Sequence, residues 1–159
     1  MTKHALAAGL LAAAIGLGGC TADGSIQVGS GAGAAARADS LWANRTDWTG
    51  DNSKVIGLVR QAGFGDAGTY TIALATKAMP YQLTVNLDDP EKPVSATDFT
   101  VPATIMLGTV ANLDEVRVLG GAGQFTLTKA EASTGLGYDV KLLGKDLSAL
   151  RSYVASAED

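Results

Sequence analysis

The stretch TYTIALATKAMPYQLTVNL, residues 69–87, decides the fold. In residues 69–76, and again in residues 81–87, larger apolar side chains alternate with polar or small ones, which is the two-residue period of a half-buried β-strand. Residues 77–80 leave room only for a short connection. We therefore predict an antiparallel pair of strands with one face on a core and the other in water.

A helix is predicted before this pair, over residues 52–62. Its apolar residues recur at helical spacing. Asp51 or Asn52 is expected as the N-cap, because an Asp or Asn side chain can accept a hydrogen bond from a free first-turn amide. Gly63 stands where the helix should end. Further upstream, residues 41–42 are expected on a short helical turn.

After the strand pair, the chain again shows both helical and strand-like patterns of apolar residues. Thr128 followed by Glu131 is a capping-box pattern that opens a helix. The order of elements predicts an α+β two-layer sandwich, in which helices pack on one face of a mostly antiparallel sheet of about four strands. The elements expected in this half are a helix over 102–110 with Pro102 at its first position, strands over 115–119 and 124–127, a short helix to about Ser133, and a helix over 143–155.

The first twenty residues have the form of a lipoprotein signal peptide. A short positive segment precedes the apolar residues 5–17, which would span roughly 20 Å as a helix, less than the ~30 Å of a bilayer core. The segment ends in Leu-Gly-Gly-Cys, which resembles the lipobox of bacterial lipoproteins. We expect residues 1–19 to be removed and Cys20 to be lipidated; the alternative is an ordinary signal peptide that contains a free cysteine.

The remainder divides into a tether and one domain. Residues 20–39 are rich in Gly, Ala and Ser and are expected to be flexible, with a root-mean-square reach of roughly 25 Å. Residues 40–155 are expected to form a single domain, and residues 156–159 a C-terminal tail. A mature chain of about 140 residues is the usual size of one domain.

Composition excludes several functions. The chain has 12 basic and 16 acidic residues with no basic cluster, which disfavours nucleic-acid binding. Cys20 and His4 are the only residues of their kinds, so the mature domain has no thiol nucleophile and no histidine base or ligand. We therefore predict no catalytic residues, no metal site and no cofactor, and expect that the domain is not an enzyme.

Three blocks carry a resemblance: WTGDNSKV at 48–55, MPYQLTV at 79–85 and VANLDEV at 110–116. They resemble the signature blocks of an uncharacterised domain family, which occurs in cell-envelope lipoproteins of Gram-positive bacteria and in the extracellular part of some sensor proteins. The resemblance covers roughly residues 40–155. It implies an envelope domain with no known activity and carries over no ligand or catalytic residue.

The aromatic residues allow two interpretations each. Trp42 and Trp48 could form a stacking platform for glycans, and Tyr81 could be presented to a sugar or peptide. Packing in the core is the favoured interpretation for all three residues, because the chain has few other large aromatic residues to fill a core.

The polar loops are ambiguous in the same way. The segment 50–53 could bind an anion or a metal at a helix N-terminus, although a capping role for Asp51 is favoured because its charge opposes an anion. Asp88, Asp89 and Glu91 could bind calcium, but they lack the spacing and the glycine of a calcium loop. A solvated turn is the favoured interpretation.

These observations predict a membrane-anchored, extracytoplasmic lipoprotein that binds an envelope protein or a cell-wall component without catalysis. The lipid on Cys20 would hold it at the membrane. Two alternatives stay open, a small cell-wall hydrolase that uses carboxylates and a regulatory module for an envelope sensor or peptidase.

Overall fold

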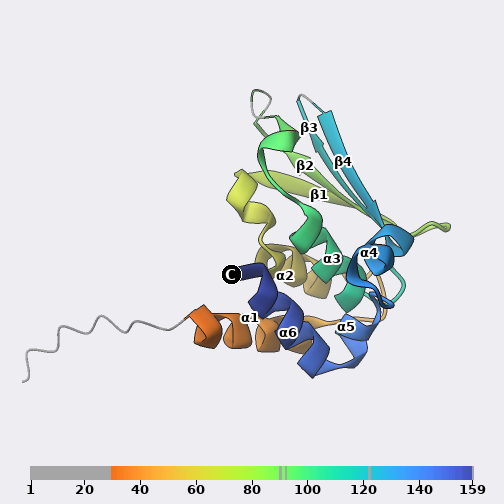
Figure 1. Cartoon of the computed structure of the whole chain (residues 1–159). Helices are drawn as coiled ribbons and strands as arrows, with labels where there is room; N and C mark the ends of the chain where they lie inside the picture. Colours follow the sequence, from red (N-terminus) through yellow and green to blue (C-terminus); the bar gives the residue numbers. More distant parts are fainter. Residues whose placement is uncertain (1–29, 90, 92, 122, 159) are drawn as a thin grey trace, which may run out of the picture.

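The structure is a computed structural model that describes residues 30–89, 91, 93–121 and 123–158. A four-stranded sheet has the spatial order β1-β2-β3-β4, with helices on one side of it and below one of its ends (Figure 1). The strands are β1 (Tyr70–Ala75), β2 (Gln82–Leu87), β3 (Glu115–Gly120) and β4 (Gly123–Thr128); the helical segments are α1 (Ser30–Asn44), α2 (Asn52–Ala62), η1 (Phe64–Ala67), η2 (Val94–Ala96), α3 (Thr100–Thr109), α4 (Lys129–Leu136), α5 (Leu142–Lys145) and α6 (Leu147–Glu158).

The predicted α+β class and mostly antiparallel sheet are confirmed. β1 pairs with β2 antiparallel, with Tyr70 opposite Leu87, and β3 pairs with β4 antiparallel. β2 and β3 are parallel neighbours, because the chain between them crosses over through η2 and α3. A parallel pair needs such a crossover, whereas the antiparallel pairs need only short connections.

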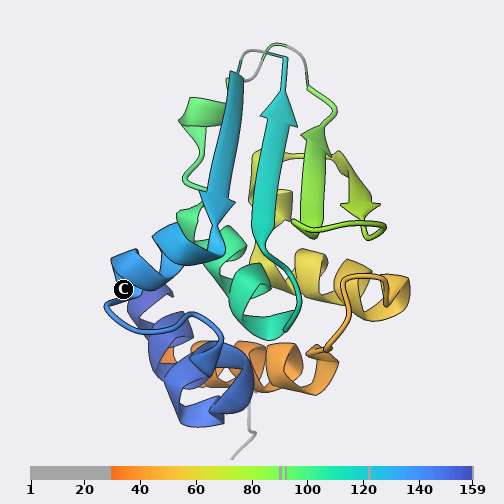
Figure 2. The same ribbon diagram turned by 90° about the vertical axis from the view of Figure 1, so that its right-hand side faces the viewer.

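The two faces of the sheet differ as the alternation predicts. Leu83, Val85, Val116 and Val118 point towards the helices and are buried. The opposite face carries mostly threonine, glutamine and charged side chains, and Figure 2 shows it uncovered. The core therefore lies between the sheet and α2 and α3. It continues between these two helices and α1, α5 and α6.

The helix predicted over residues 52–62 is confirmed as α2. Asp51 is its N-cap and accepts a hydrogen bond from the backbone N–H of Lys54. Gly63 ends it with φ of 100°, a left-handed conformation that favours glycine. Val55, Leu58, Val59 and Ala62 form its buried face.

The expected flexible tether is wrong for residues 30–39, which belong to α1. Ala34, Ala38 and Leu41 recur at helical spacing and are buried, and alanine has the highest helix propensity of any residue. Arg37 donates to the carbonyl oxygens of Gln61 and Ala62, fixing α1 to α2. Residues 41–42 lie near the end of this helix rather than on an isolated turn. Residues 1–29 lie outside the described residues.

The C-terminal helices also differ from the prediction. The helix over 143–155 is two helices, because the chain breaks at Asp146, whose carboxylate accepts the backbone N–H of Ser148 at 2.8 Å. The expected tail from residue 156 belongs to α6. α4 continues past Ser133 to Leu136 and ends at Gly137, which has φ of 76°. The predicted capping box at its start is confirmed.

Helix α3 starts two residues before the expected position, so Pro102 is its third residue rather than its first. Proline is tolerated there because the first four helical amides have no intrahelical partner. Every residue from Pro102 to Thr109 is buried. α3 is thus the central helix of the core, and its C-terminal end meets α5 at a contact between Gly108 and Gly144.

Candidate functional site

The three sequence blocks meet at one end of the sheet and are joined by side-chain hydrogen bonds. The Oδ1 of Asn112 accepts the backbone N–H of Thr49 at 2.6 Å and the Thr49 hydroxyl at 2.7 Å. The carboxylate of Asp114 accepts the backbone N–H of Tyr81 at 3.0 Å. The side chains of the third block therefore hold the first and second blocks in place.

Asp114 has a second partner, the ammonium group of Lys129 at 2.8 Å. Burial raises the pKa of the Asp114 carboxyl, but the hydrogen bonds from Lys129 and Tyr81 and the charges of Lys129 and Lys141 outweigh it, so the pKa lies below its usual value. Both carboxylate oxygens are engaged within the protein. The role of Asp114 is to join β2, β3 and α4.

A cleft of about 600 Å³ opens beside this junction. We call it the Trp48 cleft. Its walls come from the end of α1, the loop that leads to α2, the end of α3 and the helix α5. The lining residues are Ala43, Arg45, Thr46, Asp47, Trp48, Asp51, Lys54, Gly108, Thr109, Ala111, Lys141, Gly144 and Lys145.

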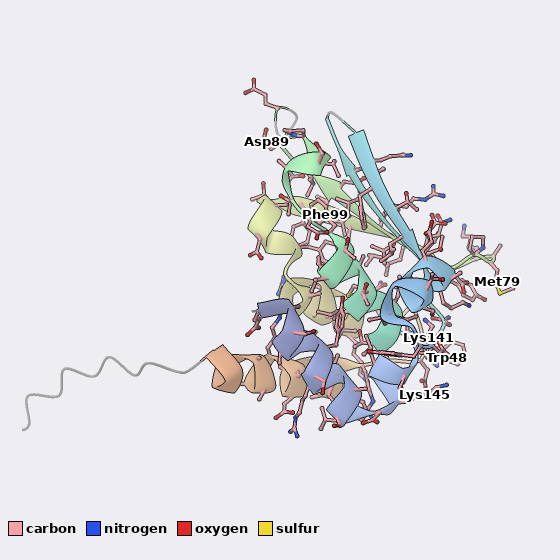
Figure 3. The ribbon with its side chains drawn as sticks, viewed as in Figure 1. Trp48, Met79, Asp89, Phe99, Lys141 and Lys145 are labelled. Carbon is pink, nitrogen blue, oxygen red and sulfur yellow. The ribbon has the colours of Figure 1, made fainter. Side chains whose placement is uncertain are left out.

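The two tryptophans have different environments. Trp42 packs against the core and carries the guanidinium of Arg45 over its ring, 3.8 Å from the centroid. Trp48 is 69% exposed, so the prediction that it packs in the core is wrong. Its loop is fixed by the bonds of Thr49 to Asn112, which leave the indole at the edge of the cleft near Lys141 and Lys145 (Figure 3).

The cleft is locally basic in an acidic protein. Four cationic and two acidic side chains line it, whereas the whole chain has a formal net charge of −4. Arg45 is occupied, because it also donates to the carbonyl oxygen of Trp42 at 2.7 Å. The ammonium groups of Lys54 and Lys145 have no hydrogen bond or ion pair within the described part of the chain. These two cations are available to a ligand.

Lys141 is held inside the protein. Its ammonium group donates to the carbonyl oxygens of Leu107, Val110 and Leu113 at 2.6, 2.9 and 2.7 Å. Burial, together with the nearby charge of Lys129, lowers the pKa of Lys141 to about 8. All three N–H groups of the ammonium are used at neutral pH. Lys141 therefore caps the C-terminal end of α3 rather than acting as a nucleophile.

The other predicted sites have structural roles. In the segment 50–53, Asp51 caps α2 and also accepts a bond from the Thr46 hydroxyl at 3.3 Å. Tyr81 is half-buried and is not among the side chains that pack against the core, so the prediction that it lies in the core is wrong. Its backbone pairs with Asp114. The loop of Asp88, Asp89 and Glu91 is at the far end of the sheet from Trp48 (Figure 3), where the Asp89 carboxylate accepts the backbone N–H of Glu91. Cys20 lies outside the described residues.

Sequence reasoning did not single out Lys54, Lys145 or Arg45. Lys54 lies in the first block and Arg45 shortly before it, whereas Lys145 is far along the chain from both, so only the packing of α5 against the end of α3 brings Lys145 to the cleft. For Trp48 there was a signal, because the residue stands between Asp47 and the Thr-Gly-Asp turn, among residues that prefer the surface.

Comparison with known proteins identifies one domain family, whose model spans the three sequence blocks. No curated protein and no solved structure matches the chain. In the part of the chain that the structure describes, no helix is long and apolar enough to cross a membrane. A family model, Domain of unknown function (DUF4825), matches residues 41–128, just over half of the chain, including all three blocks. The helices α4, α5 and α6 lie outside the matched segment. The chain therefore belongs to the DUF4825 family.

Proposed function

We propose that this protein is a lipid-anchored, extracytoplasmic domain of the cell envelope that binds an anionic glycan of the cell wall in the Trp48 cleft, without catalysis. The observation that carries the proposal is an exposed indole beside two free ammonium groups. The flat face of an indole stacks on the apolar face of a sugar ring, and Lys54 and Lys145 attract carboxylate or phosphate groups.

The position of the cleft suits a protein anchored through Cys20. Ten residue steps separate Cys20 from the start of α1, a distance of at most about 35 Å when extended. Ala43 and Arg45 line the cleft at the other end of α1, and the helix itself is about 22 Å long. Figure 3 shows the start of α1 and Trp48 on opposite sides of the molecule. A cleft on the side away from the anchor is accessible to the wall.

The anchor is tested with Cys20→Ser. In intact cells the unchanged protein is expected in the detergent phase after phase partitioning, and the variant in the medium, because the acyl chains supply about 0.8 kcal/mol per buried CH₂ group. Mass spectrometry of the mature N-terminus shows whether Cys20 carries the lipid. Equal partitioning of the two proteins would contradict the anchor.

Ligand binding is tested by co-sedimentation of the full chain, in detergent, with purified peptidoglycan and separately with a wall polymer rich in phosphate. Because its indole is the stacking surface, we expect Trp48→Ala to weaken binding at least tenfold, a loss of about 1.4 kcal/mol. Since Trp48 is largely exposed, the free energy of unfolding should change by no more than about 0.5 kcal/mol. The double variant Lys54→Ala/Lys145→Ala should also bind weakly.

The matched control is Arg117→Ala, which removes an exposed cation from the outer face of the sheet, away from the cleft. Binding that survives Trp48→Ala but not the lysine variant would show nonspecific attraction of a polyanion and would contradict the stacking site. Binding to neither polymer would contradict the proposal as a whole. The two polymers distinguish a carboxylate-bearing ligand from a phosphate-bearing one.

A carboxylate-dependent hydrolase is the second candidate, because Asp47 and Asp51 both line the cleft. Asp51 already accepts the Lys54 amide and the Thr46 hydroxyl, which leaves it poorly placed to act as an acid or a base. Release of soluble fragments from the polymer in the same experiment would favour this candidate.

A further inference from the structure

The two edges of the sheet are protected differently. At the β4 edge, η2 lies against the strand. Phe99, which follows η2, packs on Phe125 on the helix-facing side of the sheet, with ring centroids 6.0 Å apart. Figure 2 shows this segment beside β4, while the outer side of β1 is open. Among the described residues, β1 has β2 as its neighbour on one side and no strand on the other.

The open edge has ordered backbone groups ready for pairing. The backbone N–H of Asp88 donates to the carbonyl of Thr69, which sits directly opposite in the register. In an antiparallel ladder the hydrogen-bonded pairs alternate along the strand. The N–H and C=O groups of Tyr70, Ile72 and Leu74 therefore point away from β2, towards the free edge.

This edge lacks the usual protection against pairing. Natural proteins place charges, prolines or bulges on free edge strands, but β1 reads YTIALA, with no charge and no proline. A groove of about 320 Å³ runs beside it, lined by Asn52, Ile56, Ile72 and Leu74. Ile56 is 38% exposed. The edge therefore has no charge and no proline of its own, and Ile56, Ile72 and Leu74 contribute apolar side chains to the groove beside it.

We propose that β1 pairs antiparallel with β1 of a second copy of this chain, forming a two-fold dimer with a continuous eight-stranded sheet. A two-fold axis near Ile72 places Tyr70 opposite Leu74 of the second copy, and Thr71 opposite Ala73 of the second copy. Because the β4 edge is covered, pairing stops at two copies rather than extending into a filament.

The charges at the two ends of β1 favour this arrangement. Two carboxylates, Asp66 and Asp88, lie near the start of β1. One cation, Arg60, faces Tyr70 at the same end, so this end carries more negative than positive charge. Lys77 follows the end of β1. Antiparallel pairing brings the start of one strand against the end of the other. The acidic end of each copy thus meets Lys77 of the other copy, while the uncharged centres meet without repulsion.

The test is native mass spectrometry of the full chain, which is released from detergent and measured over a range of protein concentrations. We expect a dimer for the unchanged protein and at least a tenfold smaller dimer fraction for Thr71→Lys/Ala73→Lys, which sets lysines directly opposite each other across the axis. Both positions are exposed in β1, so the fold should be retained. The matched control is Gln124→Lys/Thr126→Lys, exposed on the same face at the covered edge.

A second measurement uses intact cells at native expression level. Ala73→Cys should give a product of twice the chain mass with a short bismaleimide, and Gln124→Cys should not. Three results would overturn the proposal: a monomer at all concentrations, an equal loss of dimer in the control, or capture of a different protein by Cys at position 73. The last would show that an extended segment of another protein occupies the edge. None of these results depends on the Trp48 cleft.

Discussion

Replacing Gly144 with alanine is expected to lower the free energy of unfolding by about 3 kcal/mol or more. A Cβ at this position would lie 2.4 Å from the carbonyl oxygen of Gly108, a backbone atom that cannot rotate away. The reciprocal change Gly108→Ala would bring a Cβ within 2.7 Å of the Leu143 Cβ. Overpacking of a well-packed core costs 1–3 kcal/mol and at times more, so α3 and α5 must separate.

The control for this prediction is Gly57→Ala in the interior of α2. A Cβ there would meet the Asn44 side chain at 3.7 Å, an ordinary contact. This variant should be more stable by about 0.5–1 kcal/mol, because alanine is favoured over glycine within a helix. Urea unfolding of the three proteins measures the difference. Equal stability of Gly144→Ala and the unchanged protein would mean that α5 does not pack tightly on α3.

The second large effect is expected for Asn112→Ala, a loss of about 2–3 kcal/mol. The change leaves the backbone N–H and the hydroxyl of Thr49 without their acceptor, and Thr49 is buried. A buried donor left unsatisfied costs about 1–3 kcal/mol. Because these bonds also hold the loop of Trp48, the variant should show faster amide hydrogen exchange over residues 46–50.

The control is Asn44→Ala, which removes an exposed side-chain bond to the Ser40 carbonyl at the end of α1. Its cost should stay within about 0.5 kcal/mol. Thermal unfolding followed by circular dichroism compares the two variants. If Asn112→Ala were no more harmful than Asn44→Ala, the blocks would not be held together by Asn112.

Much of the secondary structure could be predicted because its determinants are local. The period of residues 69–76 and 81–87, the cap at Asp51 and the capping box at Thr128 each depend on neighbours within a few positions. The same local reasoning misjudged residues 30–39. Their composition of Gly and Ala resembles a linker, and only the surfaces of α6 and α2, on which α1 packs, make burial of Ala34 and Ala38 favourable.

The candidate site was less predictable. Asn112 and Asp114 stand in a recognisable block, yet their hydrogen-bond partners are 63 and 33 positions away. Trp48 was predicted to be in the core because the chain has few other large aromatic residues to fill one. Its exposure follows from the loop geometry that Thr49 and Asn112 impose. Lys141 has no motif, and its three carbonyl partners exist only where α3 ends beside α5.

The sequence by itself determined the alternating strands, the helix caps, the family and the absence of histidine and cysteine after residue 20. Each of these depends on residue type and short-range order. Only the tertiary structure decided the parallel pairing of β2 with β3, the contact of Gly108 with Gly144, the cleft beside Trp48 and the open edge of β1. These features depend on how segments far apart in the sequence pack against one another, because that packing decides which surfaces are buried and which stay exposed.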